Sequence, residues 1–217
     1  MIKIVLFDVA NTLLGKPDVF REIELFCHEI GVNVSIDFIK ERHKILSEVT
    51  HFPNKTSLDF YIDFNYRLLL SLGVCASKDM AKSLFKKCTY KSWVPYEDCI
   101  ALNHFKYKKG ILSNWDKTLN SQLTNILPDL NFEIKIVSSE VGYQKPDKNI
   151  FQIATKKCGV LPEEIAFIGD SIRLDYQPSI EFGIKSILID RENAFPGFNG
   201  LRIESLHELT SILDKFQ

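Results

Sequence analysis

The sequence predicts an α/β protein in which a doubly wound parallel sheet carries an all-α domain inserted after its first strand. A short run of Ile, Val, Leu and Phe at residues 3–7 is typical of a strand buried on both faces. From Pro17 to about Lys91 no clear strand is found, and apolar residues recur at helical spacing. From Tyr96 onward, strand-like runs alternate with amphipathic stretches, which is the pattern of repeated βα units.

The inserted segment is expected to contain about four helices with short connections. Its helical spacing is clearest near the start, at Val19, Ile23, Phe26, Cys27 and Ile30. The helices are separated by the chain-breaking residues Gly31, Pro53-Asn54 and Gly73. We therefore assign residues 16–92 to a helical domain.

The other strands of the sheet are expected at residues 110–112, 134–137, 165–168 and 184–189. Helix starts are indicated at Asp116-Lys117, at Pro146-Asp147 and at residues 161–164, where proline and acidic side chains suit a first turn. We therefore assign residues 1–15 and 93–217 to the α/β core.

Composition and charge argue against several classes of partner and site. The 217 residues carry 27 Lys and Arg against 28 Asp and Glu, so no overall field attracts nucleic acid or an anionic membrane. The five cysteines form no CxxC pair, which argues against a disulfide framework and a zinc site. The apolar N-terminal run is too short to span a bilayer. We expect a cytoplasmic protein without nucleic-acid or membrane partners, and the sequence does not decide between monomer and dimer.

Ligands of doubly wound sheets bind beyond the carboxyl ends of the strands, so polar residues that directly follow strands are candidate site residues. Asp8 ends the first strand, and Asn11 and Thr12 follow it in a predicted turn. A carboxylate at this place can attack phosphorus or bind a metal. The alternative, which is the more common one for a lone Asp after a strand, is that Asp8 caps the following turn.

Two further strand ends offer groups that bind phosphate. Ser113 and Asn114 supply a hydroxyl, an amide and backbone donors, although the pair is also a common turn or helix-start signal. Lys145 precedes Pro146 and a predicted helix, where its ammonium group can be held against carboxylates or phosphate. The alternative for Lys145 is a solvated surface lysine.

The fourth strand end carries two carboxylates. Asp170 follows the strand at 165–168, and Asp175 lies five residues after Asp170. Oxygen ligands of this kind suit a hard cation such as Mg²⁺. The alternative is that Asp170 caps the next helix.

Taken in order, these segments resemble the four motifs of the haloacid dehalogenase superfamily. The matching residues are Asp8-Val9-Ala10-Asn11-Thr12, Ser113-Asn114, Lys145-Pro146-Asp147, and Gly169-Asp170 with Asp175. The resemblance covers essentially the whole chain and implies a Rossmann-like core. The helical insertion resembles the C1 cap domain of the superfamily, and residues 113–116 are closest to its subfamily IA hydrolases.

The resemblance implies a phosphatase that acts on a small phosphorylated molecule. Asp8 is then the nucleophile that forms an aspartyl-phosphate, and Lys145 is the second catalytic residue. Ser113, Asn114 and Lys145 are implied to hold the phosphoryl oxygens.

The resemblance also implies Mg²⁺ as cofactor. The metal is then bound by the Asp8 carboxylate, the Ala10 backbone carbonyl and Asp170. Thr12 and Asp175 are implied to support these ligands without contacting the metal.

The sequence departs from the pattern at Ala10, because most phosphatases of the superfamily carry a second Asp there as general acid and base. Losing positioned acid–base catalysis typically costs about 10²–10⁴-fold in rate. Three functions therefore stay open. They are a hydrolase that is slow or uses an activated phosphate, a phosphonatase-like C–P hydrolase, and a module that binds metal and phosphate without turnover.

The phosphonatase-like alternative needs a lysine of the helical domain that forms a Schiff base with an aldehyde substrate. The phosphonatases of the superfamily carry Ala at the position of Ala10, but Asn11 departs from the Gly expected after it. Candidate lysines are Lys40, Lys44, Lys55 and Lys78. Burial activates a lysine amine, and the sequence alone does not give it.

Overall fold

The computed structural model describes residues 1–52 and 56–216, and the chain forms two compact units. The core unit consists of Met1–Gly15, Val94–Arg191 and Phe195–Gln217. The helical unit consists of Lys16–Trp93 and Glu192–Ala194. Within the described ranges, no helix has the length and apolar character needed to cross a membrane.

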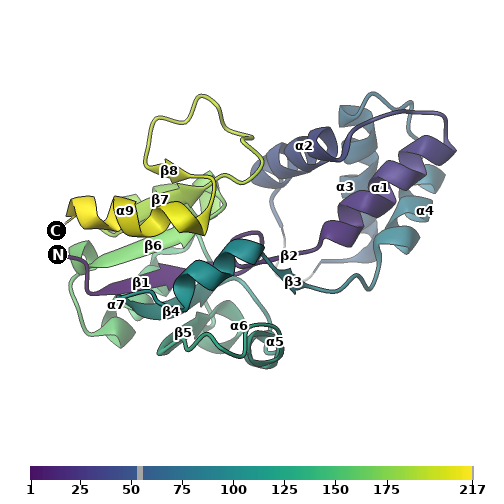
Figure 1. Ribbon diagram of the computed structural model, residues 1–217. Helices are drawn as coiled ribbons and strands as arrows, with labels where there is room; N and C mark the ends of the chain where they lie inside the picture. Colours follow the sequence, from purple (N-terminus) through teal and green to yellow (C-terminus); the bar gives the residue numbers. More distant parts are fainter. Residues whose placement is uncertain (53–55, 217) are drawn as a thin grey trace. The chain divides into compact units, whose positions relative to one another are not determined.

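The core unit is built on a parallel sheet that has six strands in the described residues (Figure 1). They are β1 (Ile4–Phe7), β4 (Lys108–Ser113), β5 (Ile134–Val137), β6 (Ile165–Gly169), β7 (Lys185–Ile189) and β8 (Arg202–Ile203). Their order in the sheet is β5-β4-β1-β6-β7-β8. The chain therefore builds outward from β1 on one side and then crosses to the other, which confirms the predicted doubly wound sheet.

The central strands end together at one edge of the sheet. Phe7 of β1 is paired with Ile111 of β4 and with Ile168 of β6. Asp8 follows Phe7 directly, and its backbone N–H donates to the Ile168 carbonyl at 2.8 Å. Residues that follow β1, β4 and β6 are therefore neighbours in space, although they are far apart in sequence.

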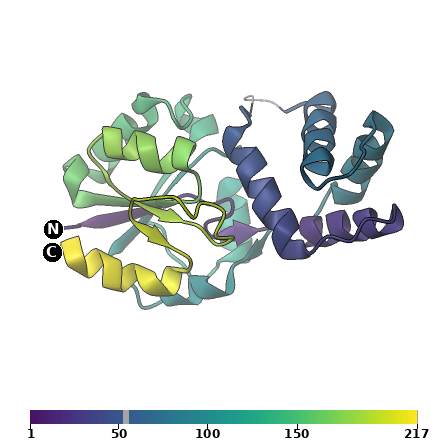
Figure 2. The same cartoon turned by 90° about the horizontal axis from the view of Figure 1, so that it is seen from above.

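Helices cover both faces of this sheet. The α-helices of the core unit are α5 (Leu119–Ile126), α6 (Ser138–Val141), α7 (Lys148–Cys158), α8 (Gln177–Glu181) and α9 (Leu209–Leu213). Green α7 and α8 lie on one side of the sheet and yellow α9 on the other (Figure 2). On the α7 side, Ile150 and Phe151 pack with Leu6 and Phe167 in a fully buried cluster.

Five short helical segments complete the core unit. Four are 3-10 helices, η1 (Glu97–Leu102), η2 (Pro162–Glu164), η4 (Leu206–Glu208) and η5 (Asp214–Phe216), and η3 (Ile172–Tyr176) is a π-helix.

A small antiparallel ribbon marks the base of the two connections to the helical unit. Its strands are β2 (Leu14–Gly15) and β3 (Val94–Pro95). The ribbon begins shortly after Asp8 and leads into η1. Both connections therefore leave the core unit next to the loop that follows β1.

Within the described residues, the helical unit has four α-helices, as predicted. They are α1 (Pro17–Glu29), α2 (Ile36–Val49), α3 (Leu58–Ser71) and α4 (Lys78–Cys88). Serine hydroxyls accept backbone N–H groups at the N-termini of α2, α3 and α4, which stabilises these helix starts. The apolar faces meet in a core that includes Ile23, Ile39, Leu68 and Leu84.

All three helix starts predicted in the core unit are followed by helical segments. α5 begins at Leu119, three residues after Asp116, and Asp147 caps α7. The helix start predicted at 161–164 is also found, with proline and acidic residues in its first turn, but the helix is only the 3-10 turn η2 because β6 pairs with β1 from Ile165 onward. The Pro53-Asn54 pair lies outside the described residues. The cap role of the predicted domain at 16–92 stays a prediction.

Candidate active site

Asp8, Lys145 and Asp175 form a buried cluster of charges at the carboxyl ends of β1 and β6. The Lys145 ammonium group donates to an Asp8 carboxylate oxygen at 2.7 Å and to an Asp175 carboxylate oxygen at 2.5 Å. None of the three side chains is more than 8% exposed. Buried charges are costly unless they are paired, and here each charge has a partner. Lys145 is therefore not a solvated surface lysine.

Asp170 brings a third carboxylate to the cluster. One carboxylate oxygen each of Asp8, Asp170 and Asp175 lies within 4.8 Å of the others. When all groups are ionised, three carboxylates and the Lys145 ammonium group leave two negative charges in a buried space. An oxygen-only donor set with this excess of negative charge fits a hard divalent cation.

The electrostatics of the cluster shift the pKa of two of its members. Burial raises the pKa of Asp175 to about 7, the Asp8 and Asp170 carboxylates add to the rise, and Lys145 opposes it. Burial by itself would lower the pKa of Lys145, but the Asp175 and Asp8 carboxylates hold it above its ordinary value. The ammonium group of Lys145 therefore stays charged at neutral pH.

Asn114 fixes the backbone that carries Lys145. The Asn114 side-chain carbonyl accepts the Lys145 backbone N–H at 2.7 Å, and its amide donates to the Lys145 carbonyl at 2.9 Å. Two residues later Asp147 accepts the Asn149 backbone N–H at 2.9 Å and caps α7. The ammonium group is thus presented from a segment held at both ends.

Asp175 is held in the cluster by the turn that follows β6. Its second carboxylate oxygen accepts the Ser171 backbone N–H at 3.0 Å. A Cβ atom on Gly169 would overlap the Asp175 carboxyl group, so this approach requires glycine. The Ser171 hydroxyl accepts the Leu174 N–H at 2.9 Å, so Ser171 rather than Asp170 supplies the helix cap.

Two buried hydroxyl groups beside the cluster lack partners. The side-chain oxygens of Thr12, in the loop after β1, and of Ser113, the last residue of β4, have no hydrogen bond among the described residues. Both residues are at most 1% exposed. Buried hydroxyls without partners are uncommon and costly, so these two are available to an oxygen-rich ligand.

The loop after Asp8 adopts a tight conformation around Ala10. Asn11 has a φ of 56°, in the left-handed region that Asn tolerates better than most residues. Its backbone N–H donates to the Leu14 carbonyl at 2.7 Å. Asn11 thus serves where the resemblance led us to expect Gly. The Ala10 side chain is a methyl group and supplies no proton donor.

Sequence reasoning missed Arg191, which lies two residues after the end of β7. Its guanidinium group donates to the Thr12 carbonyl at 2.7 Å and forms a two-pronged ion pair with Asp98 of η1. Applied to the end of the strand predicted at 184–189, the rule that identified Asp8 and Asp170 leads to Asp190, and Arg191 is the next residue.

Comparison with known proteins finds relatives along most of the chain. The haloacid dehalogenase-like hydrolase domain-containing protein 3 of Danio rerio is 25% identical over 212 residues, which are 87% of this chain and 85% of that protein. A glyceraldehyde 3-phosphate phosphatase of Methanothermobacter thermautotrophicus is 24% identical over 212 residues, which are 88% of this chain and 87% of that protein.

Solved structures share the fold over nearly the full length. The magnesium-bound HAD-hydrolase YfnB of Bacillus subtilis has a TM-score of 0.65 at 19% identity and covers 98% of this chain and 99% of its own. A HAD phosphatase of Thermococcus onnurineus has a TM-score of 0.57 at 24% identity and covers 98% of both chains.

A family model also matches most of the chain. The model for haloacid dehalogenase-like hydrolases matches residues 2–183, which contain the cluster from Asp8 to Asp175 and all four strand ends that were singled out. The match spans well over half of the chain, and the strand order and the buried acidic cluster agree with it. The protein therefore belongs to the haloacid dehalogenase-like hydrolases.

Proposed function

We propose that the protein hydrolyses a small phosphorylated substrate with Mg²⁺, through an aspartyl-phosphate on Asp8. The observation that carries this proposal is the Asp8–Lys145–Asp175 cluster, which holds a buried carboxylate against a fixed ammonium group. The family to which the chain belongs consists of hydrolases. Relatives of the chain include proteins named as phosphatases of glyceraldehyde 3-phosphate and of phosphoserine.

In this proposal the chemistry proceeds in two steps on Asp8. A carboxylate oxygen of Asp8 attacks phosphorus, the leaving group departs, and water then attacks the phosphorus of the acyl phosphate to restore the carboxylate. Lys145 balances charge on the phosphoryl oxygens, and Ser113, Thr12 and Asn114 hold them. The unpartnered hydroxyls of Thr12 and Ser113 support this role, because a phosphoryl group would supply their missing hydrogen bonds.

In this proposal Mg²⁺ would be held by Asp8, the Ala10 carbonyl and Asp170, and Asp175 would support these residues. Mg²⁺ prefers oxygen ligands, and when bound it offsets the two excess negative charges and shields the nucleophile from the phosphate. Asp175 then keeps Lys145 in place, since it accepts the Lys145 ammonium group and the Ser171 N–H together.

Ala10 sets the expected rate and the expected substrates. Without an acid at this position, a leaving group that needs a proton departs slowly, so activated phosphates such as acyl and aryl esters should be preferred.

We propose that the helical unit acts as the C1 cap of a subfamily IA hydrolase that works in the cytoplasm.

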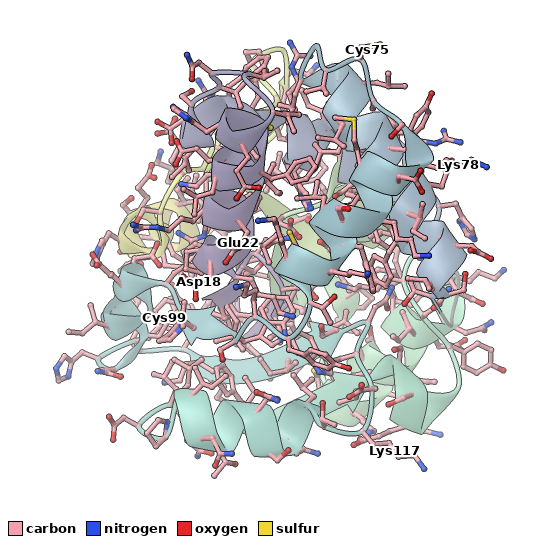
Figure 3. The ribbon with its side chains drawn as sticks, turned by 90° about the vertical axis from the view of Figure 1, so that its right-hand side faces the viewer. Asp18, Glu22, Cys75, Lys78, Cys99 and Lys117 are labelled. Carbon is pink, nitrogen blue, oxygen red and sulfur yellow. The ribbon has the colours of Figure 1, made fainter. Side chains whose placement is uncertain are left out.

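A second candidate is favoured by Ala10 itself, since phosphonatases of the superfamily also carry Ala there. Of the four lysines considered, Lys44 is buried and Lys55 lies outside the described residues. Lys40 is half-buried and pairs with Asp37 at 3.7 Å. Lys78 is exposed on the helical unit (Figure 3). Lys44 is therefore the lysine to test with borohydride trapping in the presence of a phosphonate aldehyde.

The test of the main proposal is an assay of phosphate release. Para-nitrophenyl phosphate, acetyl phosphate, glyceraldehyde 3-phosphate and phosphoserine are compared with and without Mg²⁺, in the native protein, Asp8→Asn and Ala10→Asp. The proposal expects Mg²⁺-dependent release that is lost in Asp8→Asn and is faster for the first two compounds.

Other results would point to a different function. Release that persists in Asp8→Asn would contradict the proposal. No release from the native protein, with release from Ala10→Asp, would identify a module that binds metal and phosphate without turnover.

A further inference from the structure

Arg191 connects three segments of the core unit that are far apart in sequence. Its guanidinium group donates to the Thr12 backbone carbonyl at 2.7 Å. It also donates to the two Asp98 carboxylate oxygens at 2.8 and 3.0 Å. The Arg191 and Asp98 side chains are about one-tenth exposed, so solvent screens this pair little. A two-pronged contact of this kind fixes direction as well as distance.

The segment after β3 reinforces the same loop. The Arg191 guanidinium lies over the Tyr96 ring at 3.9 Å from its centre. The Tyr96 backbone N–H donates to the Leu13 carbonyl at 3.0 Å, and the Cys99 thiol donates to the same carbonyl at 3.3 Å. Two successive carbonyl groups of the loop after Asp8 are therefore held from outside the loop.

Asp98 is itself fixed on its far side. Its carboxylate accepts the Ser205 hydroxyl at 2.9 Å and the Leu206 backbone N–H at 2.8 Å. Burial by itself would raise the pKa of Asp98, but Arg191, Leu206 and Ser205 together hold it below its ordinary value. Asp98 is therefore held in place by residues other than Arg191. Because Asp98 is fixed, the Arg191 guanidinium group that donates to the Thr12 carbonyl is fixed as well.

We infer that Arg191 is a positioning residue, which sets the orientation of the Thr12 hydroxyl relative to Asp8. This inference rests on the proposed function, because it concerns the loop after β1 that is proposed to bind the phosphoryl group. The Thr12 hydroxyl is buried without a partner, while the Thr12 carbonyl is bound by Arg191. Fixing the carbonyl side of this residue orients its hydroxyl side, which is the side that would meet the phosphoryl group.

If Arg191 only stabilised the fold, its removal would affect the protein in the same way as removal of another arginine that pairs with a buried aspartate. Arg202 provides this matched control. Arg202 also lies near β7 and pairs with a buried aspartate, Asp190, at 3.3 Å, and it donates to the Phe195 carbonyl at 3.2 Å. Removing either arginine should lower stability. Only removal of Arg191 leaves the Thr12 carbonyl without its guanidinium donor.

The experiment compares Arg191→Ala, Arg191→Lys and Arg202→Ala with the native protein. Their kcat and KM for para-nitrophenyl phosphate are measured with Mg²⁺, at a temperature where all are folded by circular dichroism. Arg191→Ala is expected to lose kcat by about 10- to 100-fold with a smaller change in KM, because misplacing groups at a reaction centre acts on the transition state. The kcat of Arg191→Lys should lie between those of the native protein and Arg191→Ala, since an ammonium group cannot bind both Asp98 and the Thr12 carbonyl.

Chemical rescue separates positioning from stability. Guanidinium ions at millimolar concentration, with sodium chloride as the ionic-strength control, should restore part of the kcat of Arg191→Ala and should leave Arg202→Ala unchanged. Equal kcat values for Arg191→Ala and Arg202→Ala would overturn the inference.

A native protein that releases no phosphate would instead count against the proposed function. In that case the role of Arg191 is tested by binding. The affinity of each variant for inorganic phosphate with Mg²⁺ is measured by calorimetry. Binding weakened in Arg191→Ala and kept in Arg202→Ala supports the inference, and equal binding overturns it.

Discussion

Lys145 is a buried ammonium group that faces two carboxylates, so the effect of its removal can be predicted at the scale of the single residue. Lys145→Met leaves Asp8 and Asp175 without their counter-charge, which typically costs about 3–5 kcal/mol for a buried pair. Urea denaturation should show this loss in the free energy of unfolding. The matched control is Lys3→Met, whose side chain is mostly exposed where it pairs with Glu164, so its removal should cost much less stability. Similar losses in both variants would contradict the role given to burial.

Gly169 permits the close packing of Asp175, and a single methyl group tests this. Gly169→Ala places a Cβ atom where the Asp175 carboxyl group lies, so it should destabilise the fold by about 1–3 kcal/mol and lower the activity. Gly197→Ala is the control, since a Cβ atom there meets nothing within 4 Å. Thermal unfolding of both variants checks the difference, and an unchanged melting temperature for Gly169→Ala would show that the turn relaxes freely.

Residue types at strand ends predicted much of this cluster from the sequence. Asp8, Asp170 and Asp175 were predicted at one edge of the sheet because parallel strands bring their carboxyl ends together. Lys145 was also assigned to a strand end, but it lies between α6 and α7, eight residues after β5. The structure brings these four together, and their roles in catalysis stay predictions. The partner that Asn114 takes, the Lys145 backbone, was not predictable, because a reciprocal amide contact leaves no spacing signal in the sequence.

At the scale of elements, the Asp98 contacts of η1 and η4 predict a dependence of stability on pH. The pKa of Asp98 is lower in the folded chain than its ordinary value, so its carboxylate stabilises the fold above the pKa of an unfolded aspartate. This contribution is lost as the pH falls through the folded-state pKa. Urea denaturation from pH 7 to pH 3 should show a gap in stability between the native protein and Asp98→Asn that narrows at the acidic end. A gap independent of pH would contradict the assignment.

The start of α7 positions the segment that presents Lys145, and its cap can be tested separately. Asp147→Ala removes the acceptor of the Asn149 N–H and should cost about 1 kcal/mol of stability. Asp147→Asn retains a good cap and should cost little. Chemical denaturation of the pair measures the difference, and equal losses would show that charge rather than capping matters at this position.

The elements that the sequence did not predict are short or depend on their partners. β2, β3 and β8 have two residues each, which is too few for a periodic pattern. The helix predicted to start at 161–164 is only a single 3-10 turn for a related reason. Its proline and acidic residues do favour a first turn, but the apolar run from Ile165 pairs with β1 and ends the turn.

At the scale of the whole molecule, the fold class was predictable because its signals are long and repeated. The doubly wound order follows from alternating strands and helices, and the helical insertion follows from the long stretch without strands. Whether the helical unit acts as a cap depends on how two compact units work together, and no local pattern carries that information.

The central claim is that Asp8 carries a phosphoryl group during turnover, and Ala10 makes this claim directly measurable. Since no acid–base group at position 10 assists the attack of water, the acyl phosphate should break down slowly and accumulate. The native protein is mixed with para-nitrophenyl phosphate and Mg²⁺, quenched in acid at successive times, digested and analysed by mass spectrometry. We expect a phosphoryl group on the peptide that contains Asp8, at a lower level in Ala10→Asp and absent in Asp8→Asn. Phosphate release without this modified peptide at any time, or release that continues in Asp8→Asn, would contradict the account.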